Sequence, residues 1–226
     1  MSAFFNFFQT GGVFMYPILV VFTVGAAIAV ERYLKLAAVH KLNRGKWDEI
    51  HPMLQEGDFE TAREATKENN TAISQLLNSG LEMEGTVRRR EDIEIAMEET
   101  MMEIIPQLEK RTPYVALFSN ISTLLGLLGT IMGLIEAFTA VANADPAEKA
   151  DLLSASISVA MNTTAFGLMA GIPLLITYVV LTAKTGEIVD SLEMASVKTL
   201  TSISKHAKRK RTAERNEMAA QSNLDA

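Results

Sequence analysis

Hydroxyl-bearing residues inside two long apolar segments are the side chains of this 226-residue chain whose spacing suggests chemistry. Thr130 lies in the middle of one segment, and Asn162, Thr163 and Thr164 lie in the middle of the other. A polar group inside an apolar segment must find a hydrogen-bond partner, and several such oxygens can replace part of the hydration shell of a cation. These residues therefore indicate a proton or ion pathway through a membrane.

Small and polar residues recur at helical spacing around these threonines. In the first segment they alternate by four and three positions, which places them on one helix face. The set is Ser119, Thr123, Gly126, Thr130, Gly133 and Ala137. The second segment has Ser156, Ala160, Thr163, Thr164, Gly167, Ala170 and Gly171, followed by Pro173. Small residues let membrane helices approach closely, so helix packing is one interpretation and the lining of a narrow wet path is the other.

A titratable group is what this predicted pathway lacks. Proton transfer through a membrane normally needs such a group facing the bundle interior. The second segment has none between Asp151 and Lys184, and the first has only Glu136, close to its outer end. We therefore expect a partner protein to supply the central carboxylate. Glu136 itself is either an ion-entry carboxylate or an interfacial charge.

The other reactive residue types do not form a catalytic pattern. The chain has no Cys, and its three His residues are scattered without the spacing of metal ligands. Three consecutive arginines, 88–90, have acidic neighbours on both sides, which favours a structural charge network over nucleic-acid binding. The sequence predicts no enzyme, no cofactor, no metal centre and no nucleic-acid partner.

The distribution of charge predicts the elements that position the threonines. Residues 1–30, 112–135 and 152–183 contain no Asp, Glu, Lys or Arg, and about 20 apolar residues suffice to cross a bilayer. Residues 1–30 lack the positive start of a signal peptide, so the first run is expected to be a retained helix at roughly residues 13–36. The predicted fold class is an all-α, polytopic membrane protein with three transmembrane helices.

Lys and Arg set the expected orientation by the positive-inside rule. Arg32, Lys35 and Lys41 follow the first run closely, whereas the connection after the second run carries only Lys149. The N-terminus is therefore expected outside and the C-terminus inside. The predicted parts are a periplasmic N-terminus with helix one (1–40), a cytoplasmic helical domain (41–111), helix two (112–142), a periplasmic connection (143–151), helix three (152–184), and a cytoplasmic helix with a basic tail (185–226).

The cytoplasmic segments carry local helix signals of their own. A turn is predicted around Gly57 and a helix cap at Thr71, and apolar residues recur at helical spacing over residues 73–81 and 93–108. The last of these helices is expected to run into the second span, interrupted by Pro106 and Pro113. The basic cluster at 205–211 is either a contact for anionic membrane lipids or a topology anchor with a solvated tail.

Two motifs carry a resemblance to a known family. Residues 123–138 read TLLGLLGTIMGLIEAF and resemble the LLGLLGTVxGMIxxF signature of the MotA/TolQ/ExbB channel family. Residues 163–173 read TTAFGLMAGIP and resemble that family's ATAxGLxVAIP segment, with Thr164 at the matching threonine. Three predicted membrane helices are typical of its ExbB/TolQ side, since the flagellar stators have four.

The resemblance implies a homopentamer in the bacterial inner membrane, around a dimer of an ExbD/TolR-like single-span partner that supplies a membrane aspartate. It also implies that the proton motive force drives motion of that partner and energises an envelope process, such as TonB-dependent uptake through a TonB-like protein. Thr130 and Thr164 would then flank the partner's aspartate. A passive membrane scaffold is the alternative from another class.

One departure from the family pattern leaves the coupling ion open. Proton-driven ExbB and TolQ chains usually carry a glutamate where this chain has Val159, and an alanine where it has Thr163. Sodium-driven flagellar relatives have a similar Thr-Thr pair. A dehydrated sodium ion needs several oxygen ligands, and Thr163 and Thr164 could provide two of them. The alternative is that the Thr163 hydroxyl only bonds a carbonyl of its own helix.

Overall fold

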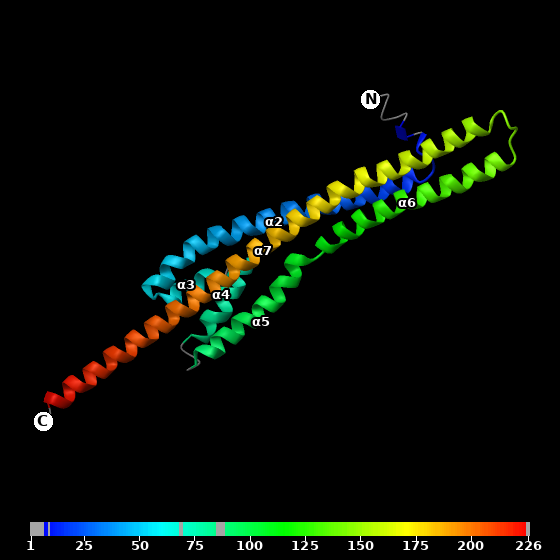
Figure 1. Cartoon of the computed structure of the whole chain (residues 1–226). Helices are drawn as coiled ribbons and strands as arrows, with labels where there is room; N and C mark the ends of the chain where they lie inside the picture. The colour runs from blue at the N-terminus through cyan, green and yellow to red at the C-terminus, as the bar shows by residue number, and fades with distance from the viewer. Residues whose placement is uncertain (1–6, 9, 68–69, 85–88, 225–226) are drawn as a thin grey trace. The chain divides into compact units, whose positions relative to one another are not determined.

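In the computed structural model, the described residues (7–8, 10–67, 70–84 and 89–224) are helical apart from short turns. The helices are α2 (Met15–Glu56), α3 (Phe59–Lys67), α4 (Ala72–Met83), α5 (Arg90–Glu109), α6 (Thr112–Ala142) and α7 (Lys149–Leu224) (Figure 1). Three stretches, in α2, α5–α6 and α7, are long and apolar enough to cross a membrane. The prediction of an all-α chain with three such helices is therefore confirmed for these residues.

The chain divides into two compact units. Unit 1 comprises Met1–Leu34 and Lys110–Ala183, and unit 2 comprises Lys35–Glu109 and Lys184–Ala226. The predicted membrane helices fall in unit 1, and the helices of the charged loop fall in unit 2.

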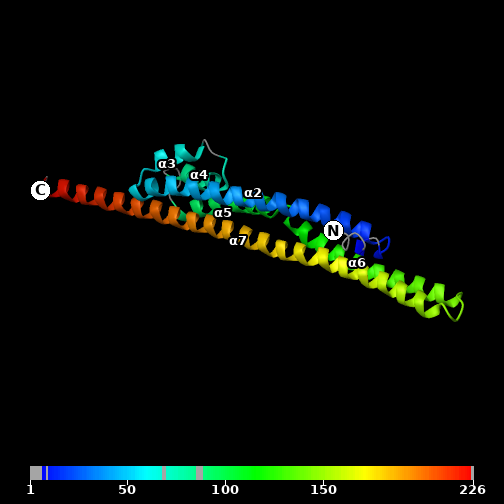
Figure 2. The same ribbon diagram turned by 90° about the horizontal axis from the view of Figure 1, so that it is seen from above.

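Unit 1 consists of α6 and the first parts of α2 and α7. α6 and the first part of α7 run antiparallel and side by side in both ribbon views, joined by the turn that precedes Lys149 (Figures 1 and 2). α2 contacts both of them at Gly25, where an added Cβ would lie 3.0 Å from side-chain atoms of Phe118 and Leu174. Met15, Ile18, Phe166 and Ala170 form the buried apolar cluster of this unit.

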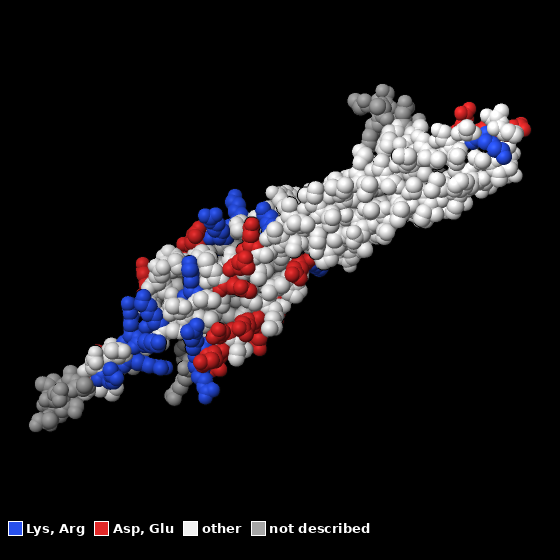
Figure 3. All heavy atoms as spheres, viewed as in Figure 1, with Lys and Arg blue, Asp and Glu red and all other residues white. Residues whose placement is uncertain are grey.

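The outer surface of unit 1 is apolar. On the visible face, Figure 3 shows the middle of unit 1 free of charged side chains, and charged side chains at the turn between α6 and α7. Large apolar side chains on α6 and α7, including Leu127, Ile131, Met169 and Ile172, are exposed. A contiguous apolar surface of this extent fits lipid or another protein, which agrees with the transmembrane character that the sequence predicts.

A helix break precedes α6. Arg111 adopts a left-handed conformation (φ 67°), and it is the non-glycine residue with a positive φ among those the structure describes. Its guanidinium donates to both carboxylate oxygens of Glu31 at 3.0 Å. The expected interruption at Pro106 is wrong, because α5 continues through Pro106 to Glu109. Pro113 lies in the first turn of α6, where a missing N–H costs no intrahelical bond.

Unit 2 confirms the local helix signals of the charged loop. α2 ends at Glu56 and α3 begins at Phe59, with Gly57 in a left-handed conformation (φ 87°) between them. Thr71 caps α4 by accepting a hydrogen bond from the Ser74 N–H. α4 packs against α3 and α5, and the second part of α7 adds Ile188, Leu192 and Ala195 to the buried residues.

Candidate functional site: the seam between α6 and α7

Glycines bring the backbones of α6 and α7 together along one seam. A Cβ added at Gly167 would lie 2.8 Å from the Gly126 Cα atom and 2.8 Å from the Ser122 carbonyl oxygen. At one end of the seam Gly133 faces Ala160, with the Ala160 Cβ 3.0 Å from the position of an added Cβ. The two predicted sets of small residues therefore face each other within one chain. These contacts support the first interpretation of the small residues, which is close helix packing.

The hydroxyl groups of Thr130 and Thr164 meet in the middle of this seam. Their Oγ1 atoms are 2.5 Å apart. Both hydroxyls also reach the Gly126 carbonyl oxygen, Thr130 at 3.1 Å and Thr164 at 3.0 Å. Because Gly126 and Gly167 have no side chain, the helices are close enough for this triangle of three oxygen atoms to form.

The triangle leaves hydrogen-bonding capacity unused. Two hydroxyls carry two protons, and each hydroxyl oxygen has two lone pairs. Three oxygen–oxygen contacts cannot each contain a separate proton, so the two O–H groups can rotate to point at the carbonyl, at each other or at an incoming group. Both threonines are partly exposed. The seam can therefore accept from or donate to a carboxyl group on a third helix laid against it.

A groove continues along the seam on the side of Ser119. It has a volume of about 530 Å³ and is lined in part by Ser119, Asn120, Thr123 and Gly171. The Ser119 hydroxyl donates across the seam to the Gly171 carbonyl oxygen at 2.7 Å, and Thr123 donates to the Ser119 carbonyl oxygen at 3.2 Å. The polar residues of the seam thus border a hollow on the surface of unit 1 rather than a closed core.

Thr163 faces a different direction from Thr164. Its buried hydroxyl reaches the carbonyl oxygens of Gly11 at 2.5 Å and Val159 at 3.0 Å. Its single proton is therefore shared between a carbonyl of its own helix and one from the segment before α2, while the Thr164 hydroxyl bonds across to α6. The structure does not bring these two hydroxyls to a common point. Next to them, the Asn162 side chain donates to the Thr10 hydroxyl at 3.3 Å.

The remaining predicted residues lie at other points of the two helices. Glu136 is exposed on α6, and its neighbour Ala137 is buried. Pro173 lies inside α7, where its carbonyl oxygen accepts from the Thr177 hydroxyl. Ala170 is buried in the cluster with Met15 and Phe166. Among the described residues, no group of three or more His, Cys, Asp or Glu is placed to hold a metal ion.

The sequence interpretation missed a second small face of α6. Ser122 and Gly129 are buried, and a Cβ on Gly129 would overlap the Thr163 side chain and lie 3.3 Å from the Phe14 Cβ. Each position lies three residues after one member of the predicted set of small residues and four residues before another member. Extending the periodicity count to them would have added both positions to the small face of α6.

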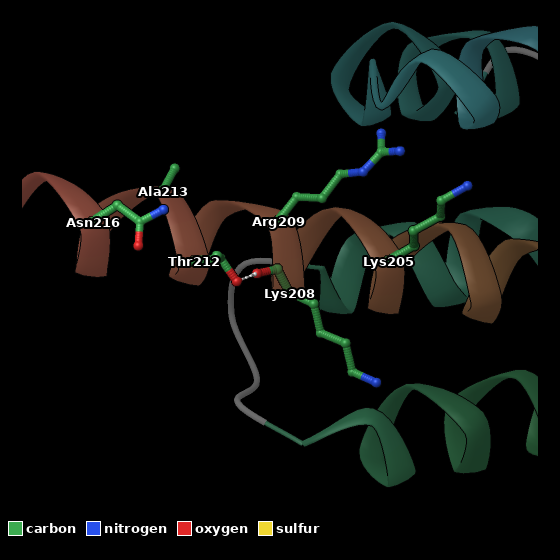
Figure 4. Close-up of a pocket in the computed structure, with 6 residues that line it drawn as sticks. All are labelled: Lys205, Lys208, Arg209, Thr212, Ala213 and Asn216. Atoms are coloured by element: carbon green, nitrogen blue, oxygen red, sulfur yellow. Dashed lines mark hydrogen bonds between the residues drawn. The ribbon is translucent and has the colours of Figure 1, made fainter.

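The basic segment of α7 belongs to unit 2. Lys205, Lys208 and Arg209 line a shallow surface hollow in unit 2 with Thr212 and Asn216 (Figure 4). α7 is a continuous helix, so Lys205 follows Lys184 by about 32 Å along its axis. The predicted contact with anionic lipid stays a prediction, and this length of helix weighs against a contact with the leaflet next to Lys184.

Three helices are long enough to cross a membrane, and two of them pack along a glycine seam with partly exposed hydroxyl groups. These features define a helical membrane protein with a row of polar groups between two of its spans. The sequence profile of the MotA/TolQ/ExbB proton channel family matches residues 68–194, more than half of the chain. The chain belongs to this family, on its ExbB/TolQ side.

Individual relatives agree with this assignment. A putative biopolymer transport protein ExbB homolog of Methanothermobacter thermautotrophicus is 28% identical over 193 residues, 83% of this chain and 66% of that protein. The Tol-Pal system protein TolQ of Haemophilus influenzae is 36% identical over 83 residues, 37% of this chain and 36% of TolQ. Biopolymer transport protein exbB1 of Vibrio cholerae is 47% identical over 57 residues, a quarter (25%) of each chain. The chain thus spans just under two thirds of the first relative's length.

Proposed function

We propose that this chain is the stator subunit of a proton-driven motor in a bacterial inner membrane. Five copies would surround a dimer of an ExbD/TolR-like single-span protein, and the partner's membrane aspartate would lie against the seam of α6 and α7. The motor would energise an envelope process, such as uptake through a TonB-like protein. The N-terminus would face the periplasm and unit 2 the cytoplasm, with the span boundaries that the charge distribution predicts.

The observation that carries this proposal is the oxygen triangle of Thr130, Thr164 and Gly126. It offers hydroxyl groups that can reorient and free lone pairs at a partly exposed position on the seam. Neither helix has a carboxylate beside it, since Glu136 lies six residues, about 9 Å, along α6 from Thr130. A carboxylate brought by another chain would complete a proton relay at this point.

The bonds of Thr163 favour the proton over sodium. A sodium site would need the Thr163 and Thr164 hydroxyls to converge on one ion, together with several other oxygens. In unit 1 the Thr163 hydroxyl is bound to Gly11 and Val159 instead. A proton needs only the partner's carboxyl group and one exchangeable hydroxyl.

The test removes the hydroxyls without changing side-chain shape. Thr130→Val and Thr164→Val are co-expressed with an ExbD/TolR-like single-span protein from the same genome, and proton uptake into proteoliposomes is measured with a pH-sensitive dye. We expect each variant to lose at least tenfold in rate, and Thr164→Ser to restore most of it. Thr177→Val is the matched control, because the Thr177 hydroxyl also bonds a carbonyl four residues back but lies away from the seam.

A passive scaffold predicts another result. If both valine variants assemble with the partner and conduct protons at the wild-type rate, the motor proposal is wrong. The same preparation tests which ion is coupled to the motor. At a fixed membrane potential, we expect the wild-type complex to take up protons at equal rates in sodium-free and sodium-containing medium.

A further inference from the structure

Unit 2 contains a cavity of about 210 Å³ between α2, the first turn of α4 and the last turns of α5. Part of its wall is apolar, formed by Val39, Leu42, Ile104 and Leu108. The rest carries ammonium, amide and hydroxyl groups, from Lys35, Asn43, Asn70, Thr71, Gln75 and Gln107. None of the described lining residues is acidic, so the charge on this wall is positive.

Asn43, one of the residues that line this cavity, has an unused hydrogen-bond donor. Its side chain is 3% exposed, and its Oδ1 atom accepts from the Ile73 N–H in the first turn of α4 at 3.4 Å. Its Nδ2 atom is buried and has no hydrogen-bond partner among the described residues. Buried donors are nearly always satisfied in native proteins, so a ligand or a water molecule in the cavity would supply the acceptor that this donor lacks.

The N-terminus of α4 adds to the positive potential. Thr71 and Ala72, at the start of this twelve-residue helix, line the cavity. The partial positive charge of a helix N-terminus favours anions, and Lys35 adds a full charge on the α2 side. The Thr71 hydroxyl is already engaged with Ser74, donating to Oγ at 2.8 Å. The anion would therefore meet the Asn43 amide, the Lys35 ammonium and the helix end.

The size of the cavity limits the ligand. At roughly 30 Å³ per water molecule, the volume corresponds to about seven waters. A tetrahedral oxyanion with a small organic substituent fits this space. The apolar part of the wall would contact the substituent, and the polar part would contact the oxygens.

We propose that this cavity binds a phosphate group carried on a small organic substituent. The group can come from the headgroup of an anionic phospholipid or from a soluble phosphomonoester. Lys35 falls in the last turn of the predicted first span (13–36), at the level where headgroups lie. The proposal is independent of the proton pathway, because none of its residues belongs to the seam.

The test uses the intact protein, purified with its partner in detergent, and two variants of the cavity. Asn43→Asp keeps an acceptor for the Ile73 N–H but replaces the donor with a negative oxygen, so it should hold the fold and reject an anion. Lys35→Gln removes the charge from an exposed side chain. Lys41→Gln is the matched control, because Lys41 is an exposed lysine of the same helix that does not line the cavity.

Two arms identify the source of the phosphate. In the first, glycerol 3-phosphate is titrated while the thermal midpoint of unfolding is recorded. In the second, the protein is exposed to phosphatidylglycerol or phosphatidylcholine, and retained lipid is counted by native mass spectrometry. We expect the midpoint to rise, or phosphatidylglycerol to be retained, in wild type and Lys41→Gln. The effect should fall at least fivefold in Lys35→Gln and vanish in Asn43→Asp.

Each outcome is decisive. A response to glycerol 3-phosphate alone supports a soluble ligand, and selective retention of phosphatidylglycerol supports the lipid headgroup. If neither probe acts, or if Lys35→Gln and Lys41→Gln respond equally to it, the proposal is wrong. Should Asn43→Asp fail to fold, the comparison of the two lysine variants still decides the question.

Discussion

Gly167 lies so close to Gly126 that a Cβ on Gly167 would be 2.8 Å from the Gly126 Cα atom. This contact and the contact between Thr130 and Thr164 depend on each other. Gly126 supplies the carbonyl oxygen that both hydroxyls reach, and any side chain at either glycine would separate the helices. The packing of the small residues and the meeting of the two hydroxyl groups are therefore both consequences of the close approach of α6 and α7.

Gly167→Ala should separate α6 from α7. The added methyl group meets backbone atoms of α6, which cannot rotate away, so overpacking should cost about 1–3 kcal/mol. Gly186→Ala is the control, because an added Cβ there meets nothing within 4 Å and alanine favours the helix. Thermal unfolding in detergent should show a lower midpoint for Gly167→Ala and an equal or higher one for Gly186→Ala. Equal midpoints would contradict the close approach.

Glu31→Gln should destabilise the junction before α6 more than Arg111→Gly does. Both side chains are about half exposed, so their ion pair contributes no more than about 1 kcal/mol. Arg111→Gly loses the same pair but relieves a left-handed backbone conformation that costs a non-glycine residue roughly 1–2 kcal/mol. The double variant should match Arg111→Gly alone. The midpoints of thermal unfolding of the three variants test this order. If the midpoint of Glu31→Gln stays below that of wild type in high salt, the result would argue against an ion pair.

Gly57→Ala should loosen the turn between α2 and α3. A Cβ at this position would lie 2.5 Å from atoms of the His206 ring, and the left-handed conformation strains an alanine in addition. His206 is held there by a contact between its Nε2 atom and the Gln55 carbonyl oxygen at 3.2 Å. We expect faster hydrogen exchange at the end of α2 and around His206. Gly45→Ala, which meets nothing within 4 Å, should leave exchange unchanged.

Local patterns predicted the elements of this chain well. The charge-free runs identified the apolar helices, and the Thr71 cap and the turn at Gly57 depend on residues within three positions of each other. The two sets of small residues identified the seam between α6 and α7, because small residues at helical spacing are enriched where membrane helices contact each other. In each case the physical cause of the structure lies within a few turns of the residue concerned.

Contacts between distant residues were the part that sequence patterns did not reveal. The break before α6 falls at Arg111 rather than at Pro106, and the Arg111 side chain there pairs with Glu31, 80 positions away. The hydroxyl of Thr163 turns to Gly11, 152 positions away. No periodicity within a segment specifies such partners, so these two positions needed the three-dimensional arrangement.

Glu136→Gln tests whether protons enter at the outer end of α6. Glu136 is exposed and lies about 9 Å along the helix from Thr130, so a carboxylate there can collect protons for the seam. We expect a several-fold lower proton flux, with the largest loss at high external pH, where protons are scarce. Glu148→Gln changes another exposed carboxylate at the same end of unit 1 and serves as control. An unchanged flux in Glu136→Gln would make this residue an interfacial charge only.

Thr163→Val distinguishes a structural hydroxyl from an ion ligand. The Thr163 hydroxyl is buried and bonded to two carbonyl oxygens, so its removal leaves the Gly11 carbonyl without that donor and should cost about 1 kcal/mol. If its role is structural, the unfolding midpoint falls while the rate of proton uptake per assembled complex stays independent of sodium. If Thr163 is a sodium ligand, wild-type activity requires sodium and the valine variant raises the sodium concentration for half-maximal rate at least tenfold. Measuring both quantities on the same preparation separates the two roles, and we expect the first result because the Thr163 and Thr164 hydroxyls have no common partner.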